Sequence, residues 1–102
     1  MRKTRENNVE AFLRKKLSKL NVNCYKIIPD NCTGLPDRLV TLPNGRCIWV
    51  ELKTDGGALS EIQKYRHREL REQGQEVAVV WSKEEADKFA DWVGNIIKGE
   101  VY

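Results

Sequence analysis

Gly34-Leu35-Pro36-Asp37-Arg38 and Glu51-Leu52-Lys53 enclose a short hairpin. Residues 38–42 and 46–52 predict two strands on either side of Pro43-Asn44-Gly45, where Asn-Gly readily takes the positive φ of a hairpin turn. Asp37 enters the first strand and Glu51 lies at the end of the second. Because antiparallel pairing folds these strand ends back beside each other, the sequence predicts that the two acids are neighbours in space.

Two acids at neighbouring strand ends suit a hard divalent cation, because a cation relieves the repulsion between like charges. Mg²⁺ and Mn²⁺ prefer carboxylate and carbonyl oxygens, so Asp37, Glu51 and the backbone carbonyl of Leu52 form a candidate ligand set. Lys53 shares the strand face of Glu51, where its ammonium group could hold an attacking water or offset charge on a phosphorane. Glu51 and Lys53 alone would also fit a surface ion pair, but the turn before Asp37 favours a site for metal-assisted phosphodiester hydrolysis.

The segments around the hairpin predict two helices and one further strand. Apolar residues at helical spacing indicate a first helix over residues 5–20, and residues 22–28 form a β-rich segment that Pro29 ends. Ser60-Glu61-Ile62-Gln63 has the spacing of a capping box, and Gly74 is placed to end the helix that this box opens. The face of this second helix expected to be buried carries Ile62, Tyr65, the stem of Arg66, and Leu70.

The C-terminal part predicts a strand and a last helix. Residues 76–81 are almost continuously apolar, which favours a central strand buried on both faces. Ser82-Lys83-Glu84-Glu85 is a second capping-box pattern that starts the last helix. An antiparallel hairpin followed by a helical crossover gives the α/β order αβββαβα, with a mixed four-stranded sheet flanked by helices. The three tryptophans, Trp49, Trp81 and Trp92, are expected in the core.

Length and composition favour one ordinary globular domain spanning residues 1–102. No apolar run approaches the roughly 20 residues that span a bilayer, and the basic N-terminus lacks the apolar segment of a secretory signal, so we expect a cytoplasmic protein without membrane partners. The formal net charge of +3 is compatible with nucleic acid but does not establish it. Cys24, Cys32 and Cys47 lack the spacing of a zinc site and are expected to be reduced thiols.

The chain resembles the virus-type replication-repair nuclease (VRR-NUC) family of the PD-(D/E)XK superfamily of restriction-like nucleases. Gly34-x-Pro36-Asp37-Arg38 followed by Glu51-Leu52-Lys53 carries the resemblance, which extends from residues 9–13 through residues 59–63 and Gly74 to residues 77–81. It implies a restriction-endonuclease-like fold and an endonuclease that needs Mg²⁺ or Mn²⁺. It also implies a role in DNA repair on branched DNA such as four-way (Holliday) junctions. The small, single-domain type favours a virus or prophage protein that acts in a bacterial cell or a phage-infected host.

The resemblance implies further site residues on the two helices that flank the hairpin. The family has a glutamate on its first helix, which matches Glu10 as a direct or water-mediated metal acid, although Glu6 lies one turn earlier. Glu10 also fits a capping partner of Asn7. Gln63 matches the family's glutamine on the second helix, and it also completes the capping box of Ser60.

Three more residues are candidates for contact with DNA. His67 lies four residues after Gln63 on the same helical face, where it could contact phosphate or transfer a proton, or could be an ordinary surface histidine. Lys26 could approach the scissile phosphate or face solvent. Arg38 either braces the turn or touches phosphate, and the sequence leaves both roles open.

Resolving a four-way junction takes two symmetric cuts, so a two-fold homodimer is expected. Its interface is expected to draw on apolar residues of the first and last helices: Phe12, Trp92, Ile96, Ile97, Val101 and Tyr102. Two alternatives remain. One is a flap- or restriction-like nuclease that acts on another DNA shape. The other is a catalytically silent DNA-binding module, which the intact Asp37, Glu51 and Lys53 disfavour.

Overall fold

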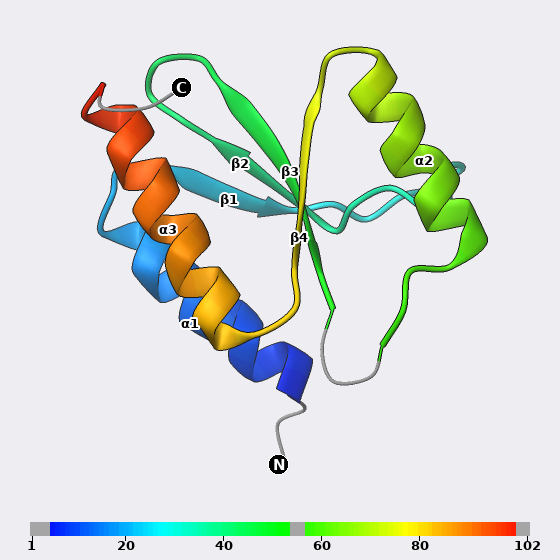
Figure 1. Ribbon diagram of the computed structural model, residues 1–102, viewed down its shortest axis with the longest axis horizontal. Coiled ribbons are helices and arrows are strands. Elements are labelled where there is room, and N and C mark those ends of the chain that lie inside the picture. The colour runs from blue at the N-terminus through cyan, green and yellow to red at the C-terminus, as the bar shows by residue number, and fades with distance from the viewer. Residues whose placement is uncertain (1–4, 54–56, 100–102) are drawn as a thin grey trace.

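The computed structural model describes residues 5–53 and 57–99, with side chains described from residue 8 onward. The elements in chain order are α1 (Arg5–Ser18), β1 (Asn23–Lys26), β2 (Arg38–Thr41), β3 (Cys47–Leu52), α2 (Glu61–Glu72), β4 (Glu76–Val80) and α3 (Lys83–Ile97) (Figure 1). This order confirms the predicted αβββαβα succession, with each strand slightly shorter than its sequence pattern indicates. No helix in the described ranges is long and apolar enough to cross a membrane.

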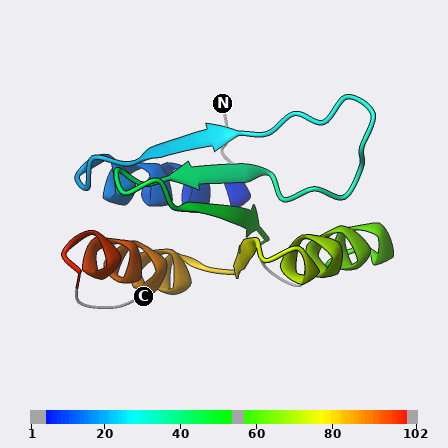
Figure 2. The same ribbon diagram turned by 90° about the horizontal axis from the view of Figure 1, so that it is seen from above.

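The four described strands form one mixed sheet in the order β1-β2-β3-β4 (Figure 2). The β1–β2 and β2–β3 pairs are antiparallel, and the β3–β4 pair is parallel. The prediction of a central strand at residues 76–81 is wrong, because β4 lies at an edge of this sheet. Both α2 and α3 contact β4, so helices on both faces account for its apolar sequence without a strand on each side.

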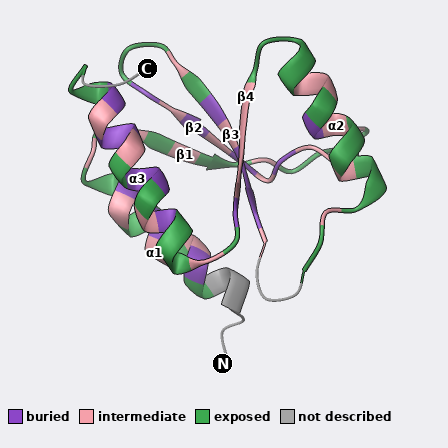
Figure 3. Cartoon of the chain, in the orientation of Figure 1, coloured by how far each residue is buried: buried purple, intermediate pink, exposed green. Residues whose placement is uncertain are grey.

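The apolar core lies on the side of the sheet that α1 and α3 cover together (Figures 1 and 3). Residues three or four positions apart on each helix supply one apolar stripe, which packs on the inward face of the strands. The buried apolar side chains of this core are Val9, Leu13, Leu17, Val40, Leu42, Ile48, Val50, Leu52, Val80, Ala86, Phe89, Ala90, Val93 and Ile96. Trp92 packs partly against them. The predicted core positions of Trp49 and Trp81 are wrong, because Trp49 is only half-buried and lies outside this cluster, and Trp81 is 37% exposed.

Local turn and cap signals fixed the ends of several elements as the sequence predicts. Gly45 has a φ of 90°, and Asn44 Oδ1 accepts a hydrogen bond from the Arg46 N–H in the hairpin turn. Ser60 caps α2: its Oγ accepts from the Gln63 N–H, and the Gln63 side chain accepts in return from the Ser60 N–H. The proposed capping role of Glu10 is wrong, because α1 begins at Arg5 and Asn7 lies inside it.

The second helix packs differently from the other two. Most of its surface is exposed (Figure 3), and the predicted buried face is wrong at Ile62 and Tyr65, each 41% exposed. The fully buried residue of α2 is His67, at 1% exposure. Helix α2 lies on the opposite side of the sheet from α1 and α3, where it contacts β4 (Figure 1).

Candidate functional site

Asp37 and Glu51 lie at neighbouring ends of β2 and β3. Arg38 pairs with Val50 in the antiparallel register, so Asp37, just before β2, is beside the last residues of β3. The Leu52 N–H donates to Asp37 Oδ1 at 3.2 Å, and the Asp37 carbonyl accepts from the Ile27 N–H at 2.9 Å. Neighbouring backbone on both sides therefore fixes the position of Asp37, and the hairpin brings the two predicted acids together.

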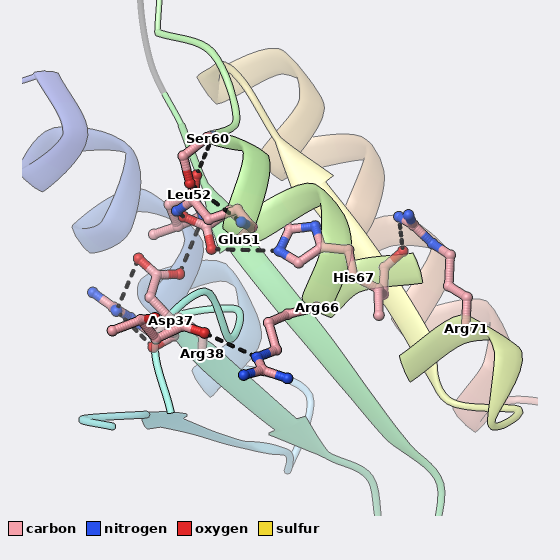
Figure 4. Close-up of polar contacts among 11 residues, drawn as sticks. Asp37, Arg38, Glu51, Leu52, Ser60, Arg66, His67 and Arg71 are labelled. Carbon is pink, nitrogen blue, oxygen red and sulfur yellow. Dashed lines mark hydrogen bonds and ion pairs between the residues drawn. The ribbon is translucent and has the colours of Figure 1, made fainter. Parts of the chain in front are cut away.

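Helix α2 faces both carboxylate oxygens of Glu51, a side chain that is only 5% exposed (Figure 4). Gln63 Nε2 donates to Glu51 Oε2 at 3.4 Å, and His67 Nε2 lies 3.8 Å from Glu51 Oε1. Gln63 does this while its Oε1 also accepts from the Ser60 N–H, so both of its predicted roles are present at once. The cap that starts α2 thus also aims an amide at Glu51.

His67 is buried, where the sequence leaves open an ordinary surface histidine. Burial lowers the pKa of this imidazole, and the nearby charges of Arg71 and Lys53 lower it further. Within the described part of the chain, neither ring nitrogen has a hydrogen-bond partner. With 1% exposure the ring is directed at Glu51 rather than at solvent. A lone histidine carries no periodic signal, so the sequence could not reveal this position.

Arg38 connects Glu10 on α1 to Asp37. Its Nη2 donates to Glu10 Oε2 at 3.0 Å, and its Nη1 donates to the Asp37 carbonyl at 2.9 Å and lies 3.4 Å from Asp37 Oδ2. Its side chain is 9% exposed, so of the two roles left open for Arg38 the geometry favours the brace. Glu10 also lies 3.8 Å from Arg14, and the side chain of Glu6 falls outside the described residues.

The two lysines differ in their surroundings. Lys53 follows β3, is half-buried, and donates its backbone N–H to the Val80 carbonyl at 2.9 Å, which ties this end of the site to β4. Its positive charge contributes to the lowered pKa of His67. Lys26 is exposed at the end of β1, in register with Arg38.

The loop that carries Asp37 is docked on α2. Gly34 has a φ of +89°, and a Cβ at this position would lie 2.6 Å from the Ile62 carbonyl oxygen. Arg66 Nε donates to the Thr33 carbonyl at 3.1 Å and holds the same loop (Figure 4). The sequence indicates a turn at Gly34-Leu35-Pro36, but not that a glycine is required for close contact with another helix.

The donor set at this site consists of hard oxygens. No group of three His, Cys, Asp or Glu side chains within residues 8–53 and 57–99 is placed to hold a metal ion. Mg²⁺ is usually held by one or two carboxylates and keeps several waters, so Asp37 and Glu51 fit it without a third acid. Cys24, Cys32 and Cys47 are free thiols, and burial raises the pKa of the Cys24 thiol.

The known proteins that this chain resembles are described as a nuclease or as VRR_NUC domains. No family model matches the chain. "Putative nuclease p44" of Acyrthosiphon pisum secondary endosymbiont phage 1 is 37% identical over 84 residues, which cover 82% of this chain and 90% of that protein. A solved structure described as a "VRR_NUC domain" superposes with a TM-score of 0.81 at 29% identity, covering 87% of this chain and 97% of that one. A second, a "VRR_NUC domain protein", has a TM-score of 0.62 over 99% of this chain and 91% of its own, and its 16% identity supports the fold alone.

Proposed function

This chain belongs to the virus-type replication-repair nuclease (VRR-NUC) family, and we propose that it is an endonuclease that needs Mg²⁺ or Mn²⁺ and cleaves branched DNA. The observation that carries the proposal is the arrangement at the paired ends of β2 and β3. There Asp37 accepts from the Leu52 N–H, Glu51 is faced by α2, and Lys53 follows. Hard oxygens beside a cation are what phosphodiester hydrolysis requires.

The carboxylates of Asp37 and Glu51, with the Leu52 carbonyl, would hold the cation. When bound, the cation would polarise a phosphoryl oxygen and lower the pKa of a coordinated water. Lys53 would position the attacking water or accept its proton, and its ammonium form would offset charge on the phosphorane. Gln63 would orient Glu51 through the 3.4 Å contact to Oε2. Glu10 would act on Asp37 from outside the ligand shell, because Arg38 lies between these two acids.

Basic side chains close to the two acids would bind the DNA backbone. Lys26 is exposed at the β1 end that is paired with Arg38, so it is near the start of β2. A groove of about 530 Å³ between α1 and β1 includes Glu10, Arg14 and Lys15 among its lining residues. Phosphate contacts by such residues position a duplex without reading its sequence, which suits recognition of DNA shape.

A homodimer would supply the two cuts that a four-way junction needs. Of the residues expected at its interface, Ile96 is wrong because it is buried in the core at 5% exposure. Phe12 and Trp92 also pack partly against the core, Ile97 is 36% exposed, and Val101 and Tyr102 lie outside the described residues. The dimer therefore rests on the geometry of the reaction more than on surplus apolar surface.

A cleavage assay on four DNA shapes tests this function. Linear duplex, a 5′ flap, a splayed duplex and a four-way junction are incubated with the protein in Mg²⁺, Mn²⁺, Ca²⁺ or EDTA. We expect paired nicks in the junction with Mg²⁺ or Mn²⁺, and inhibition by Ca²⁺, which takes the same oxygens at longer and looser distances. Lys53→Ala should lose cleavage yet still bind Mn²⁺, because Lys53 is not a ligand.

The outcomes separate the alternatives. Preferential cutting of flaps would replace the junction by another DNA shape and keep the nuclease. Binding without cleavage of any substrate in either metal would leave a silent DNA-binding module. Light scattering at micromolar concentration checks the dimer independently, and a monomer that cuts linear and branched DNA equally would remove both the dimer and the junction preference.

A further inference from the structure

Two side chains of α2, one helical turn apart, face the two oxygens of the Glu51 carboxylate. Gln63 approaches Oε2 and His67 approaches Oε1, and the i and i+4 positions place them on one face of the helix. The helix that carries them is capped at Ser60 and docked through Gly34 and Arg66 onto the loop of Asp37. A rigid element thus presents two polar groups to one carboxylate.

Burying the imidazole of His67 costs free energy. Both ring nitrogens lack a hydrogen-bond partner within the described residues, and an unsatisfied buried polar group costs about 1–3 kcal/mol. An apolar side chain of similar size would pack there without this penalty. To the residues that the structure describes, the ring makes no hydrogen bond that would stabilise the fold, so a role other than stability has to explain a histidine at this position.

The geometry disfavours two roles in which His67 would act directly. At 1% exposure the ring offers almost no surface for a DNA phosphate. In Figure 4 the Glu51 carboxylate lies between Asp37 and His67, so the ring approaches from the side away from the other acid. Consistent with this, His67 does not form a metal-holding group with Asp37 and Glu51 among the described residues. The atom that His67 can influence is Glu51 Oε1, 3.8 Å from its Nε2.

We propose that His67 is a positioning residue, which directs an N–H dipole at Glu51 Oε1 and thereby holds the Glu51 carboxylate in the orientation that cation binding uses. This inference rests on the proposed function. A neutral imidazole has one N–H, and with that proton on Nε2 it attracts the carboxylate without neutralising its charge. Gln63 fixes the second oxygen, so the two contacts together restrict rotation of the carboxylate. Groups that orient metal-binding carboxylates typically change metal affinity or activity 10–100-fold when removed.

Mn²⁺ binding tests this proposal without relying on cleavage. Isothermal titration calorimetry with MnCl₂ compares the wild type with His67→Phe, His67→Leu and His67→Gln, and each variant is also melted in EDTA. Leu70→Ala serves as the packing control, because it trims a half-buried apolar side chain of the same helix. Asp37→Ala serves as the reference for loss of the site itself.

We expect the Phe and Leu variants to bind Mn²⁺ about 10-fold more weakly or worse, on the order given for such outer contacts, while melting at or above the wild-type temperature. The Gln variant should recover part of the affinity, because its amide can donate an N–H. Cleavage by the Phe and Leu variants should need correspondingly more Mg²⁺, with an unchanged KM for DNA.

Wild-type Mn²⁺ affinity in the Leu variant would overturn the inference, as would a loss no larger than that of Leu70→Ala. Failure of all three His67 variants to fold would also overturn it, because His67 would then be needed for the structure itself. If Asp37→Ala binds Mn²⁺ like the wild type, the proposed metal site fails and takes this inference with it. If Asp37→Ala loses Mn²⁺ and the His67 variants do not, only the inference about His67 fails.

Discussion

The two faces of the sheet bury side chains of different chemical character. Among the residues that the structure describes, the face under α1 and α3 buries fourteen apolar side chains in one cluster, whereas the face under α2 buries Glu51 and His67. Helix α1 reaches the site through the Glu10–Arg38 contact, and α2 reaches it directly through Gln63 and His67. This difference predicts that stability and the proposed chemistry depend on opposite sides of β3, so that substitutions should separate the two.

The largest difference between an effect on cleavage and an effect on stability is expected at Asp37 and Glu51. Asp37→Ala or Glu51→Ala should lower the cleavage rate by at least about a thousandfold, which corresponds to about 4 kcal/mol of barrier. The fold should be retained, and the melting temperature in EDTA should stay or rise slightly because repulsion between the acids is relieved. Single-turnover cleavage and thermal melts measure the two effects. An Asp37→Ala protein with the wild-type rate would show that the site is assigned to the wrong residues.

The converse substitution lies on the apolar face. Leu13 is 0% exposed, and Leu13→Ala should lower the free energy of unfolding by about 2–5 kcal/mol through lost burial and a residual cavity. Urea denaturation measures this loss. At a temperature where the variant is still folded, its Mn²⁺ affinity should equal that of the wild type. A large loss of Mn²⁺ affinity in the folded variant would mean that the two faces are coupled.

Gly34→Ala probes the joint between the Asp37 loop and α2. An alanine at φ +89° is strained by about 1–2 kcal/mol, and its Cβ would meet the Ile62 carbonyl at 2.6 Å, so the loop must move away from α2. Gly45→Ala is the matched control, because Gly45 has φ +90° and nothing within 4 Å of an added Cβ. We expect both variants to lose stability, but only Gly34→Ala to lose cleavage, by about tenfold. Equal cleavage by the two variants would argue that docking of the loop does not matter.

The smallest effect is expected at the Arg46–Glu76 pair, which lies beside Trp92 of α3. Hydrogen bonds from Arg46 at 2.6 and 2.7 Å lower the pKa of Glu76. A lowered carboxyl pKa stabilises the fold above the ordinary glutamate pKa, and this contribution is lost as the pH falls through the lowered value. Glu76→Gln should therefore cost about 0.5–1 kcal/mol at pH 7 and less at pH 2. Urea denaturation at both pH values checks this; an equal difference at both would assign the effect to packing.

The sequence predicted what local signals specify. Asn44-Gly45 marked the hairpin, Ser60 and Gln63 marked the start of α2, and both were found in the structure as predicted. The sequence predicted the wrong place in the sheet for the strand at residues 76–81. An apolar run is expected both for an edge strand covered by helices on its two faces and for a central strand between two others, so the sequence does not distinguish them. The surroundings of His67 and Arg38 depend on contacts between segments far apart in the chain. Such contacts leave no trace in the spacing of residues.

The hairpin also sets an order in which the site is assembled. Asp37 and Glu51 are fourteen positions apart on paired strands, so a β-hairpin, which forms within about 1–10 μs, is enough to bring them together. Gln63 and His67 reach Glu51 only when α2 has docked. Helix α2 lies between β3 and β4 in the sequence, so the parallel pairing of these two strands joins segments separated by the whole helix. Non-local parallel pairing is slow compared with hairpin closure. We therefore expect the two acids to meet during folding before Gln63 and His67 reach Glu51.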